Sequence, residues 1–186
     1  MELGKTLYVV DRKAWRSWLA KNHKKENEIW LIYYRKASGK PRIAYIDAVE
    51  EAICYGWIDG IVKKVDETRF AQRFTPRRPG SAFSEMNKEH ARRLIKKKRM
   101  TAAGLKTLPK GFGQSKEKLV IASDVLKELK ADKQVWKNFQ AFPDYYKRIR
   151  IAYIESQRRH GSEMFQKSLL NFIKMTAKNT RFGMLK

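Results

Sequence analysis

The chain has 186 residues, of which 42% are hydrophobic and 12% aromatic, which is enough to build a core and argues against wholesale disorder. A single cysteine excludes an intramolecular disulfide, and 42 basic against 19 acidic residues give a net charge of +23. The longest uncharged apolar run, Ile29–Tyr34, is far shorter than the roughly 20 residues of a transmembrane helix, so we expect no membrane span. The single cysteine and the lack of a signal-peptide pattern at the N-terminus make a cytoplasmic location the default expectation.

The positive charge is concentrated in the middle of the chain. Residues 61–118 contain 17 basic and 5 acidic residues, whereas residues 1–60 contain 11 and 8. Such a field attracts nucleic acid, anionic lipid surfaces or phosphorylated ligands. The alternative is that the charge serves solubility alone.

The first elements along the chain predict a helix, a buried strand and a second helix. Asp11 is a good N-cap for a helix from Arg12 to about Asn22. The apolar run Ile29–Tyr34 suits a central strand that is covered on both faces. Residues 42–45 can add a short strand, and residues 46–55 follow with helical spacing of their apolar side chains.

A β-hairpin and a basic helix come next. Residues 57–65 and 69–75 alternate as two strands around a short turn. Pro76 ends the sheet, and Ser84 can cap a helix that runs to about Lys98. A short helix is expected to follow at Thr101–Leu105, and the segment Thr107–Lys118 is the best candidate for a linker.

Beyond the linker all patterns are helical. We expect helices that begin near Ser123, Asp132 and Pro143, and a last helix that Ser162 caps. In the third of these helices the inward residues are expected to be Tyr145, Ile149, Ala152 and Tyr153. The fold class is therefore α+β: a small, mainly antiparallel sheet packed by helices in residues 1–110, followed by a helical module in residues 111–186.

Three segments of the middle region carry a resemblance to a known family. They are EEAICYGWIDG (residues 50–60), FTPRRPGSAFSEMN (residues 74–87) and RMTAAGL (residues 99–105). Their order and spacing resemble the YdeI/OmpD-associated family of bacteriocin-protection proteins. Phe83 stands where that family usually has Trp, and Lys98 replaces a Gly. The resemblance implies an OmdA-like helical tail and a link to tolerance of cationic antimicrobial peptides in bacteria, but no established enzymatic chemistry.

One group of residues has the chemistry of an anion site. Arg77 and Arg78 precede Ser81 and Ser84 at an expected helix N-terminus, where free backbone N–H groups and the helix dipole favour anions. Two arginines add bidentate donors for phosphate or carboxylate. With Arg73, Trp57 and Asp59 alongside, these residues predict a site for an anionic small molecule or peptide; the alternative is ordinary capping beside a solvated arginine pair.

The basic helix supports a different hypothesis. Lys88, Arg92, Lys96 and Arg99 recur at helical spacing and would form a stripe on its outer face. Like charges so spaced repel one another, which favours an anionic partner, and nucleic acid is the alternative partner that we consider for this stripe. No sequence motif for nucleic-acid recognition accompanies the stripe.

Catalytic chemistry has little support in the sequence. The three histidines are far apart, and no Cys/His cluster or phosphate-binding Gly loop is present, so we expect no metal and no cofactor. Cys54 lies in an apolar helix and is expected to be a buried, unreactive thiol. An enzyme of unknown class that uses Asp59 or Cys54 stays as a further alternative, with no catalytic residue assigned.

Overall fold

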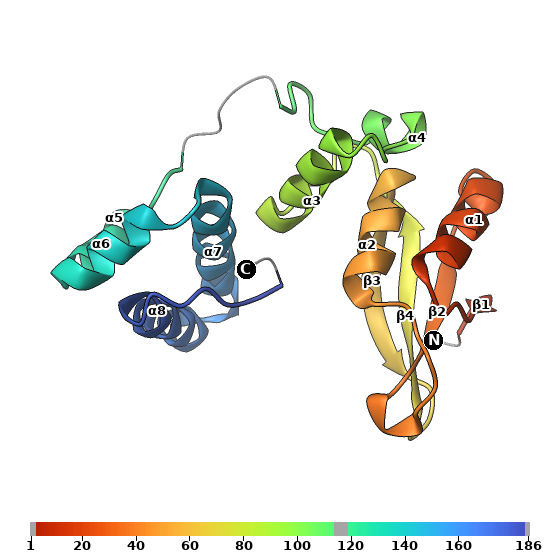
Figure 1. Cartoon of the computed structure of the whole chain (residues 1–186), viewed down its shortest axis with the longest axis horizontal. Coiled ribbons are helices and arrows are strands. Elements are labelled where there is room, and N and C mark those ends of the chain that lie inside the picture. The colour runs from red at the N-terminus through yellow and green to blue at the C-terminus, as the bar shows by residue number, and fades with distance from the viewer. Residues whose placement is uncertain (1–2, 114–118, 185–186) are drawn as a thin grey trace. The chain divides into compact units, whose positions relative to one another are not determined.

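The computed structural model describes residues 3–113 and 119–184, and these form two compact units (Figure 1). The first unit comprises Met1–Phe83 and His90–Phe112, and the second comprises Ser84–Glu89 and Gly113–Lys186. Residues 114–118 of the expected linker lie outside the described residues. Leu108 and Phe112, from the same expected linker, pack against the core of the first unit.

A four-stranded sheet forms the first unit's framework. Its strands are β1 (Thr6–Leu7), β2 (Ile29–Tyr34), β3 (Trp57–Lys64) and β4 (Arg69–Pro76), in the order β1-β2-β4-β3. The short strand β1 is parallel to β2, and the other two pairings are antiparallel. The α+β class with a mainly antiparallel sheet is therefore confirmed.

The hairpin of β3 and β4 follows from local chemistry. The Asp66 carboxylate accepts hydrogen bonds from the backbone N–H groups of Thr68 and Arg69, both at 2.8 Å, which closes the turn. A register shift between Asp59 and Val62 marks a bulge in β3. Strand β3 lies at the edge of the sheet, so Val62 is exposed just beyond this bulge.

Two helices pack on one face of this sheet (Figure 1). Helix α1 (Arg12–Asn22) starts at Asp11, whose carboxylate accepts from the Ala14 N–H at 2.8 Å, as its capping position predicts. Helix α2 (Tyr45–Cys54) runs next to α1. The shared core includes Trp15, Leu19, Ile29, Leu31, Ala48, Ala52 and Phe74.

Residues 42–44 do not form the expected short strand. A single backbone hydrogen bond joins the Ile43 N–H to the Val9 oxygen at 3.3 Å, and α2 begins at Tyr45. Pro41 cannot donate a hydrogen bond to a strand ladder, and α2 already begins at Tyr45. The segment between them is therefore too short to pair as a strand. The strand that completes the sheet on this side is β1, which the sequence pattern did not indicate.

Helix α3 (Glu85–Lys96) ends in a Schellman motif, and α4 (Ala102–Lys106) follows. The Lys98 N–H donates to the Ile95 oxygen and the Arg99 N–H to the Leu94 oxygen, both at 2.9 Å. Lys98 has a φ of 54°, the left-handed region in which glycine is the usual residue. The motif therefore explains why glycine would suit this position, and nothing in the structure explains the lysine that stands there.

The second unit consists largely of helices around its own core. They are α5 (Ser123–Lys130), α6 (Lys133–Ala141), α7 (Asp144–Gln157) and α8 (Ser162–Ala177), and they begin close to the expected positions. Ser162 is the first helical residue of α8, and the N-cap position belongs to Gly161. The core of this unit includes Val125, Leu129, Phe139, Tyr146, Ile154, Phe165, Leu169 and Phe172.

Helix α7 buries a face that only partly matches the expected one, since Ile149 is buried as predicted. Tyr146 and Arg150 are buried, whereas Tyr153 is 47% exposed. Apolar side chains occur all round this helix, so several faces fit the helical period almost equally well. The segment that follows α8 also packs against α7, since the Phe182 N–H donates to the Tyr146 hydroxyl at 3.1 Å. This contact lies outside the pattern of α7 itself.

Candidate functional site

The loop after β4 buries an arginine. The Arg77 N–H donates to the Gly56 oxygen at 2.8 Å, which fixes the start of the loop beside the end of α2. The Arg77 guanidinium lies 3.6 Å from the centre of the Phe83 ring, and its Nη2 donates to the Ala82 oxygen. These contacts hold the side chain in place with only 7% of the residue exposed.

The buried guanidinium of Arg77 is incompletely satisfied. Its Nε and Nη1 atoms have no hydrogen-bond partner among the described residues. Burial lowers the pKa of Arg77, and the negative charge of Asp59 opposes that shift only in part. Because buried donors without acceptors are costly, such an arginine is a favourable position for a ligand's anionic group.

Arg77 lines an open pocket of about 670 Å³ in the first unit. One wall is the loop from Arg77 to Phe83, and the other is the segment from Lys106 to Lys110. The lining contains no acidic side chain and four basic ones, which are Arg77, Arg78, Lys106 and Lys110. Pro79, Phe83, Leu108 and Pro109 supply apolar surface. The pocket therefore has the composition that suits an anion with an apolar part.

Tight packing positions the second wall. A Cβ atom at Gly104 would lie 2.3 Å from the Cys54 oxygen, so only glycine allows α4 to approach the end of α2 this closely. The Thr101 hydroxyl donates to the Cys54 oxygen at 2.6 Å and accepts from the Gly104 N–H at 3.3 Å. The segment RMTAAGL thus holds Lys106–Lys110 opposite the loop of Arg77.

Of the residues predicted for the anion site, Arg77, Arg78 and Ser81 line this pocket. The Ser81 hydroxyl donates to the Arg78 oxygen at 2.8 Å. Ser84 belongs to the second unit, where its hydroxyl accepts from the Asn87 N–H at 3.2 Å. Glu85 adds a negative charge to the first turn of α3. The Ser84 hydroxyl and the Glu85 carboxylate therefore already cap this helix N-terminus and offset its positive dipole.

The structure does not bring Trp57, Asp59 and Arg73 into the lining of the pocket. Trp57 is 1% exposed, and its indole N–H donates to the His23 oxygen at 3.2 Å. The Asp59 carboxylate accepts from the Tyr45 hydroxyl at 2.6 Å, and Arg73 donates to Glu28 across the sheet at 2.8 Å. Trp57 is thus part of the core, and the other two have partners within the protein.

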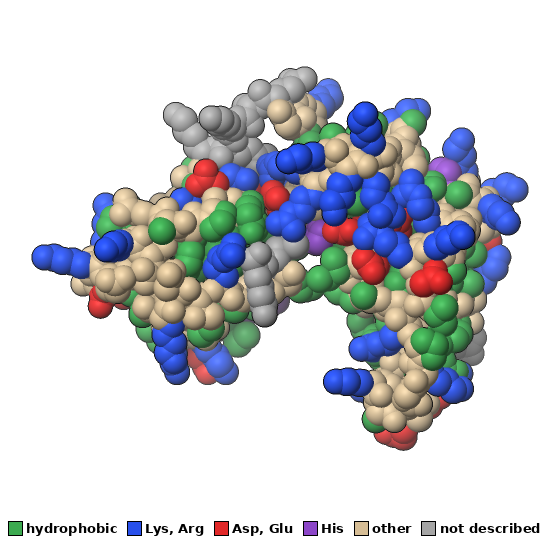
Figure 2. All heavy atoms as spheres, in the orientation of Figure 1, with side chains coloured by type: hydrophobic (Ala, Val, Ile, Leu, Met, Phe, Trp, Pro, Cys, Tyr) green, Lys and Arg blue, Asp and Glu red, His purple; other side chains and the backbone are tan. Residues whose placement is uncertain are grey.

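The predicted basic stripe is only partly available to a partner. Lys88 pairs with Glu85 at 2.7 Å, and the Arg99 Nη2 donates to Glu51 at 2.5 Å. The Arg92 guanidinium lies 5.4 Å from the centre of the Phe112 ring, while Lys96 is exposed. Lys and Arg side chains gather over this part of the first unit, but acidic side chains lie among them (Figure 2).

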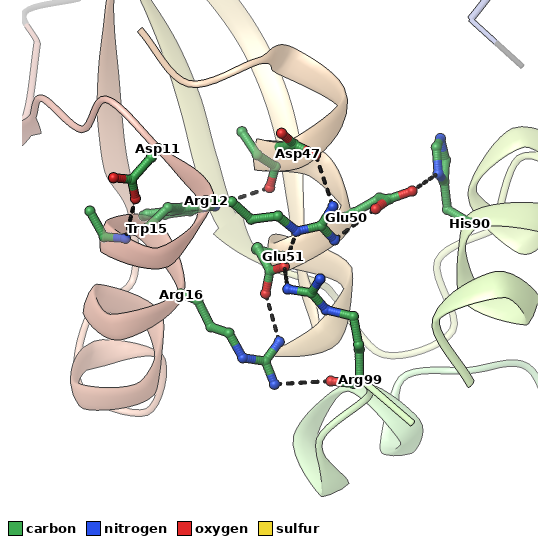
Figure 3. A network of polar contacts seen from close by, with 11 residues as sticks. Asp11, Arg12, Trp15, Arg16, Asp47, Glu50, Glu51, His90 and Arg99 are labelled. Atoms are coloured by element: carbon green, nitrogen blue, oxygen red, sulfur yellow. Dashed lines mark hydrogen bonds and ion pairs between the residues drawn. The ribbon is translucent and has the colours of Figure 1, made fainter. Parts of the chain in front are cut away.

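A cluster of ion pairs connects α1, α2 and the segment after α3 (Figure 3). Glu51 is completely buried and accepts hydrogen bonds from three arginines, Arg12, Arg16 and Arg99. Glu50 accepts from Arg12 at 2.7 Å and contacts His90 Nδ1 at 3.0 Å. The cluster joins two of the three segments that carry the resemblance, residues 50–60 and 99–105, and its acids are matched by bases, so we assign it a structural role.

The electrostatics of this cluster are mutually stabilising. Burial acts to lower the pKa of Arg12, and hydrogen bonds with Glu51 and Glu50 outweigh it, so the pKa is raised. The hydrogen bond with His90, helped by Arg12, lowers the pKa of Glu50 to about 2. Both side chains therefore stay ionised at neutral pH.

Cys54 lies beside this cluster and shows no sign of activation. Burial, together with the negative charge of Glu51, raises the pKa of its thiol to about 11. Within residues 3–113 and 119–184, no group of three or more His, Cys, Asp or Glu side chains could hold a metal ion. No helix in these residues is long and apolar enough to cross a membrane.

Two features of the pocket were missed by sequence reasoning. Lys106 falls between the expected helix and the expected linker, and Lys110 lies within that linker, which has no periodicity, so neither was included in the site. The signal that could have found them is Gly104, since a glycine inside a helix indicates a close approach to another segment.

Two models of known families match this chain, one in the region of the sheet and one in the helical tail. A family model described as a domain of unknown function (DUF8412) matches residues 7–107. A model described as Bacteriocin-protection, YdeI or OmpD-Associated matches residues 118–179. The helical tail thus carries the YdeI/OmpD-associated match. The three segments that resemble that family lie instead within the DUF8412 match. No curated protein and no solved structure gives a significant match.

Proposed function

Because this chain belongs to the DUF8412 family, whose function is unknown, and has a YdeI/OmpD-associated domain at residues 118–179, we propose a function from its own residues. The first unit binds an anionic small molecule or peptide in the pocket between the loop of Arg77 and residues 106–110. The protein acts by binding, without catalysis.

The observation that carries this proposal is the buried, partly unsatisfied guanidinium of Arg77. Nε and Nη1 point from opposite edges of the guanidinium, so a carboxylate or phosphate can accept a charge-assisted hydrogen bond from one of these two free donors. The Phe83 ring and the bond to Ala82 hold the guanidinium in one orientation before a ligand arrives. Such preorganisation reduces the entropy lost on binding.

The remaining lining indicates the class of ligand. Arg78, Lys106 and Lys110 are exposed and add positive charge at the rim without a fixed geometry. Leu108 and the two prolines offer apolar surface beside the charged group. A phosphate or carboxylate attached to an apolar body therefore fits better than a bare inorganic ion.

Nuclear magnetic resonance titration of the full ¹⁵N-labelled chain with phenyl phosphate, at constant ionic strength and followed at the amides of the pocket lining, tests this proposal. We expect saturable binding that Arg77→Lys weakens by about tenfold or more, because lysine keeps the charge but loses the planar guanidinium that Phe83 and Ala82 hold in place. Lys106→Ala and Lys110→Ala remove only exposed side chains, so they leave the fold intact and should each weaken binding several-fold, by about 0.5–1 kcal/mol.

The matched control is Arg35→Gln, which removes a positive charge from an exposed side chain outside the pocket. This variant should bind phenyl phosphate as the unmodified chain does. If the chain does not bind this probe, or if Arg77→Lys, Lys106→Ala and Lys110→Ala all bind it with unchanged affinity, the pocket is not an anion site.

A further inference from the structure

A second arginine is buried in the helical unit, on α7. Arg150 is 9% exposed, and its Nε atom has no hydrogen-bond partner among the described residues. Its guanidinium lies 3.9 Å from the centre of the Phe182 ring and 5.1 Å from that of Tyr153. These aromatic rings stabilise the cation through their faces, but they accept no conventional hydrogen bond.

The segment after α8 fixes the Phe182 ring over this guanidinium. The Tyr146 hydroxyl accepts the Phe182 N–H at 3.1 Å. The next residue, Gly183, has a φ of 98°, and a Cβ atom there would lie 3.4 Å from the Arg150 Nη1. The chain therefore passes close to Arg150 in a conformation that favours glycine. The surroundings of Arg150 are thus built by three separate elements: α7, α8 and this segment.

A pocket of about 320 Å³ opens at Arg150, which is at the small end of the range for ligand sites. Helix α8 contributes Lys167, Ser168 and Asn171 to its lining, and this spacing places the three on one face. Tyr153, Met164 and Phe182 complete the lining, which contains no acidic side chain. Two cations, a hydroxyl and an amide therefore converge beside an aromatic and apolar rim.

We propose that this pocket is a second ligand site, which takes a small phosphate or carboxylate with a flat apolar body. The anionic group accepts from Arg150 and Lys167, and Ser168 and Asn171 offer further hydrogen bonds. The flat body packs on the rim formed by Tyr153, Met164 and Phe182. The site lies wholly within the second unit and does not depend on the pocket of Arg77.

A purely structural role for Arg150 makes a different prediction. In that case the guanidinium only fills space between aromatic rings, and removal of the exposed Lys167 would change nothing at the pocket. A ligand site, in contrast, requires both cations to act on the same anion. Lys167 and Asn171 are exposed, so their replacement by alanine tests the site without disturbing the core.

The test is a nuclear magnetic resonance titration of the full ¹⁵N-labelled chain with phenyl phosphate at constant ionic strength. We expect saturable shifts at the amides of Lys167, Ser168, Asn171 and Gly183. Inorganic phosphate, which lacks the ring, and phenol, which lacks the charge, should each bind at least about tenfold more weakly. Lys167→Ala should weaken phenyl phosphate by about tenfold, and Arg150→Lys by more.

Lys174→Ala is the matched control, because it removes one exposed charge from the same helix outside the pocket. It should leave the affinity for phenyl phosphate unchanged. Arg77→Lys should also leave the shifts at α8 unchanged, which separates this site from the one in the first unit. The proposal is overturned if these amides do not shift, or if Lys167→Ala and Lys174→Ala have the same effect.

Discussion

Glu51 and Arg77 are both charged and both buried, yet their surroundings differ. Glu51 accepts hydrogen bonds from three arginines, whereas two nitrogens of Arg77 have no partner among the described residues. A buried charge surrounded by its counterions is typical of a structural position, and one without them is typical of a ligand position. Arg150 resembles Arg77 in this respect.

Replacement of Glu51 by alanine is expected to destabilise the first unit strongly. Arg12, Arg16 and Arg99 would lose their common acceptor inside the protein, and breaking a buried ion pair in this way costs about 3–5 kcal/mol. Urea unfolding measures the loss. Glu67→Gln removes an exposed carboxylate that pairs with the exposed Lys64 and should change stability by less than about 1 kcal/mol. Equal losses in the two variants would contradict a structural role for Glu51.

The ion pairs of Glu50 predict an acid-sensitive fold. The pKa of Glu50 falls from an ordinary 4.5 to about 2, first because of the hydrogen bond with His90 and then because of Arg12. A lowered pKa contributes stability that is complete above pH 4.5 and is lost as the pH falls towards 2. Denaturant unfolding between pH 5 and 2 should therefore show a steeper loss in the unmodified chain than in Glu50→Gln. Parallel curves would contradict this assignment.

The connection from α3 to α4 shows how one element positions another. The Schellman motif turns the chain at Lys98, Arg99 then reaches Glu51, and Thr101 caps α4 against the end of α2. Each step uses a specific residue of the segment RMTAAGL or the residue just before it. The second wall of the Arg77 pocket depends on this sequence of contacts.

Lys98→Gly is expected to stabilise the protein by about 0.5–1 kcal/mol. The left-handed conformation is sterically unfavourable for lysine, and glycine relieves this strain. The free energy gained in this way exceeds the loss that comes from the greater chain entropy of glycine in the unfolded state. Thermal unfolding measures the change. Lys96→Gly, at the C-terminal end of α3, should instead destabilise by up to about 1 kcal/mol. A loss of stability in both variants would show that the left-handed turn is not under strain.

Gly104→Ala tests the link between α4 and the pocket. The added Cβ atom would lie 2.3 Å from the Cys54 oxygen, so α4 has to move away from α2. We expect a loss of about 1–3 kcal/mol in stability together with weaker binding of phenyl phosphate. A Cβ at Gly60 would meet Arg73 only at 3.7 Å or more, so Gly60→Ala should be tolerated. Unchanged binding in Gly104→Ala would mean that the second wall does not matter.

Helix α1 and the hairpin were predictable from the sequence because their signals are local. Asp11 caps the helix, and the carboxylate of Asp66 closes the turn, each within a few residues. The complete buried face of α7 could not be predicted from the sequence, because Phe182 reaches Arg150 from a distant part of the chain. In the candidate site, the arginines of the loop were predictable, whereas the pairing of that loop with Lys106–Lys110 depends on the tertiary packing of Gly104.

At the scale of the whole molecule, the net charge of +23 acts on any polyanion. Lys88 and Arg99 already have acidic partners within the protein, so the surface lacks the continuous free stripe that its sequence spacing predicts. The charge therefore supports attraction at a distance more than recognition of a base sequence.

Duplex DNA is accordingly expected to bind at about 50 mM salt and to be released by about 200 mM, without preference for sequence. Phosphate contacts alone account for such binding, because its free energy comes from the release of counterions. Fluorescence anisotropy over a salt series measures it. Sequence-selective binding at about 200 mM salt would favour nucleic-acid recognition as the function, and absence of binding at 50 mM would remove that alternative.

The bulge in β3 has a consequence for how copies of this protein behave at high concentration. An edge strand with exposed backbone groups and apolar side chains such as Ile61 and Val62 can pair with the same strand of another molecule and start aggregation. The bulge interrupts that edge just before Val62, and Lys63 follows at once with a positive charge that repels another copy. The irregular stretch of the hairpin therefore protects the sheet from self-association.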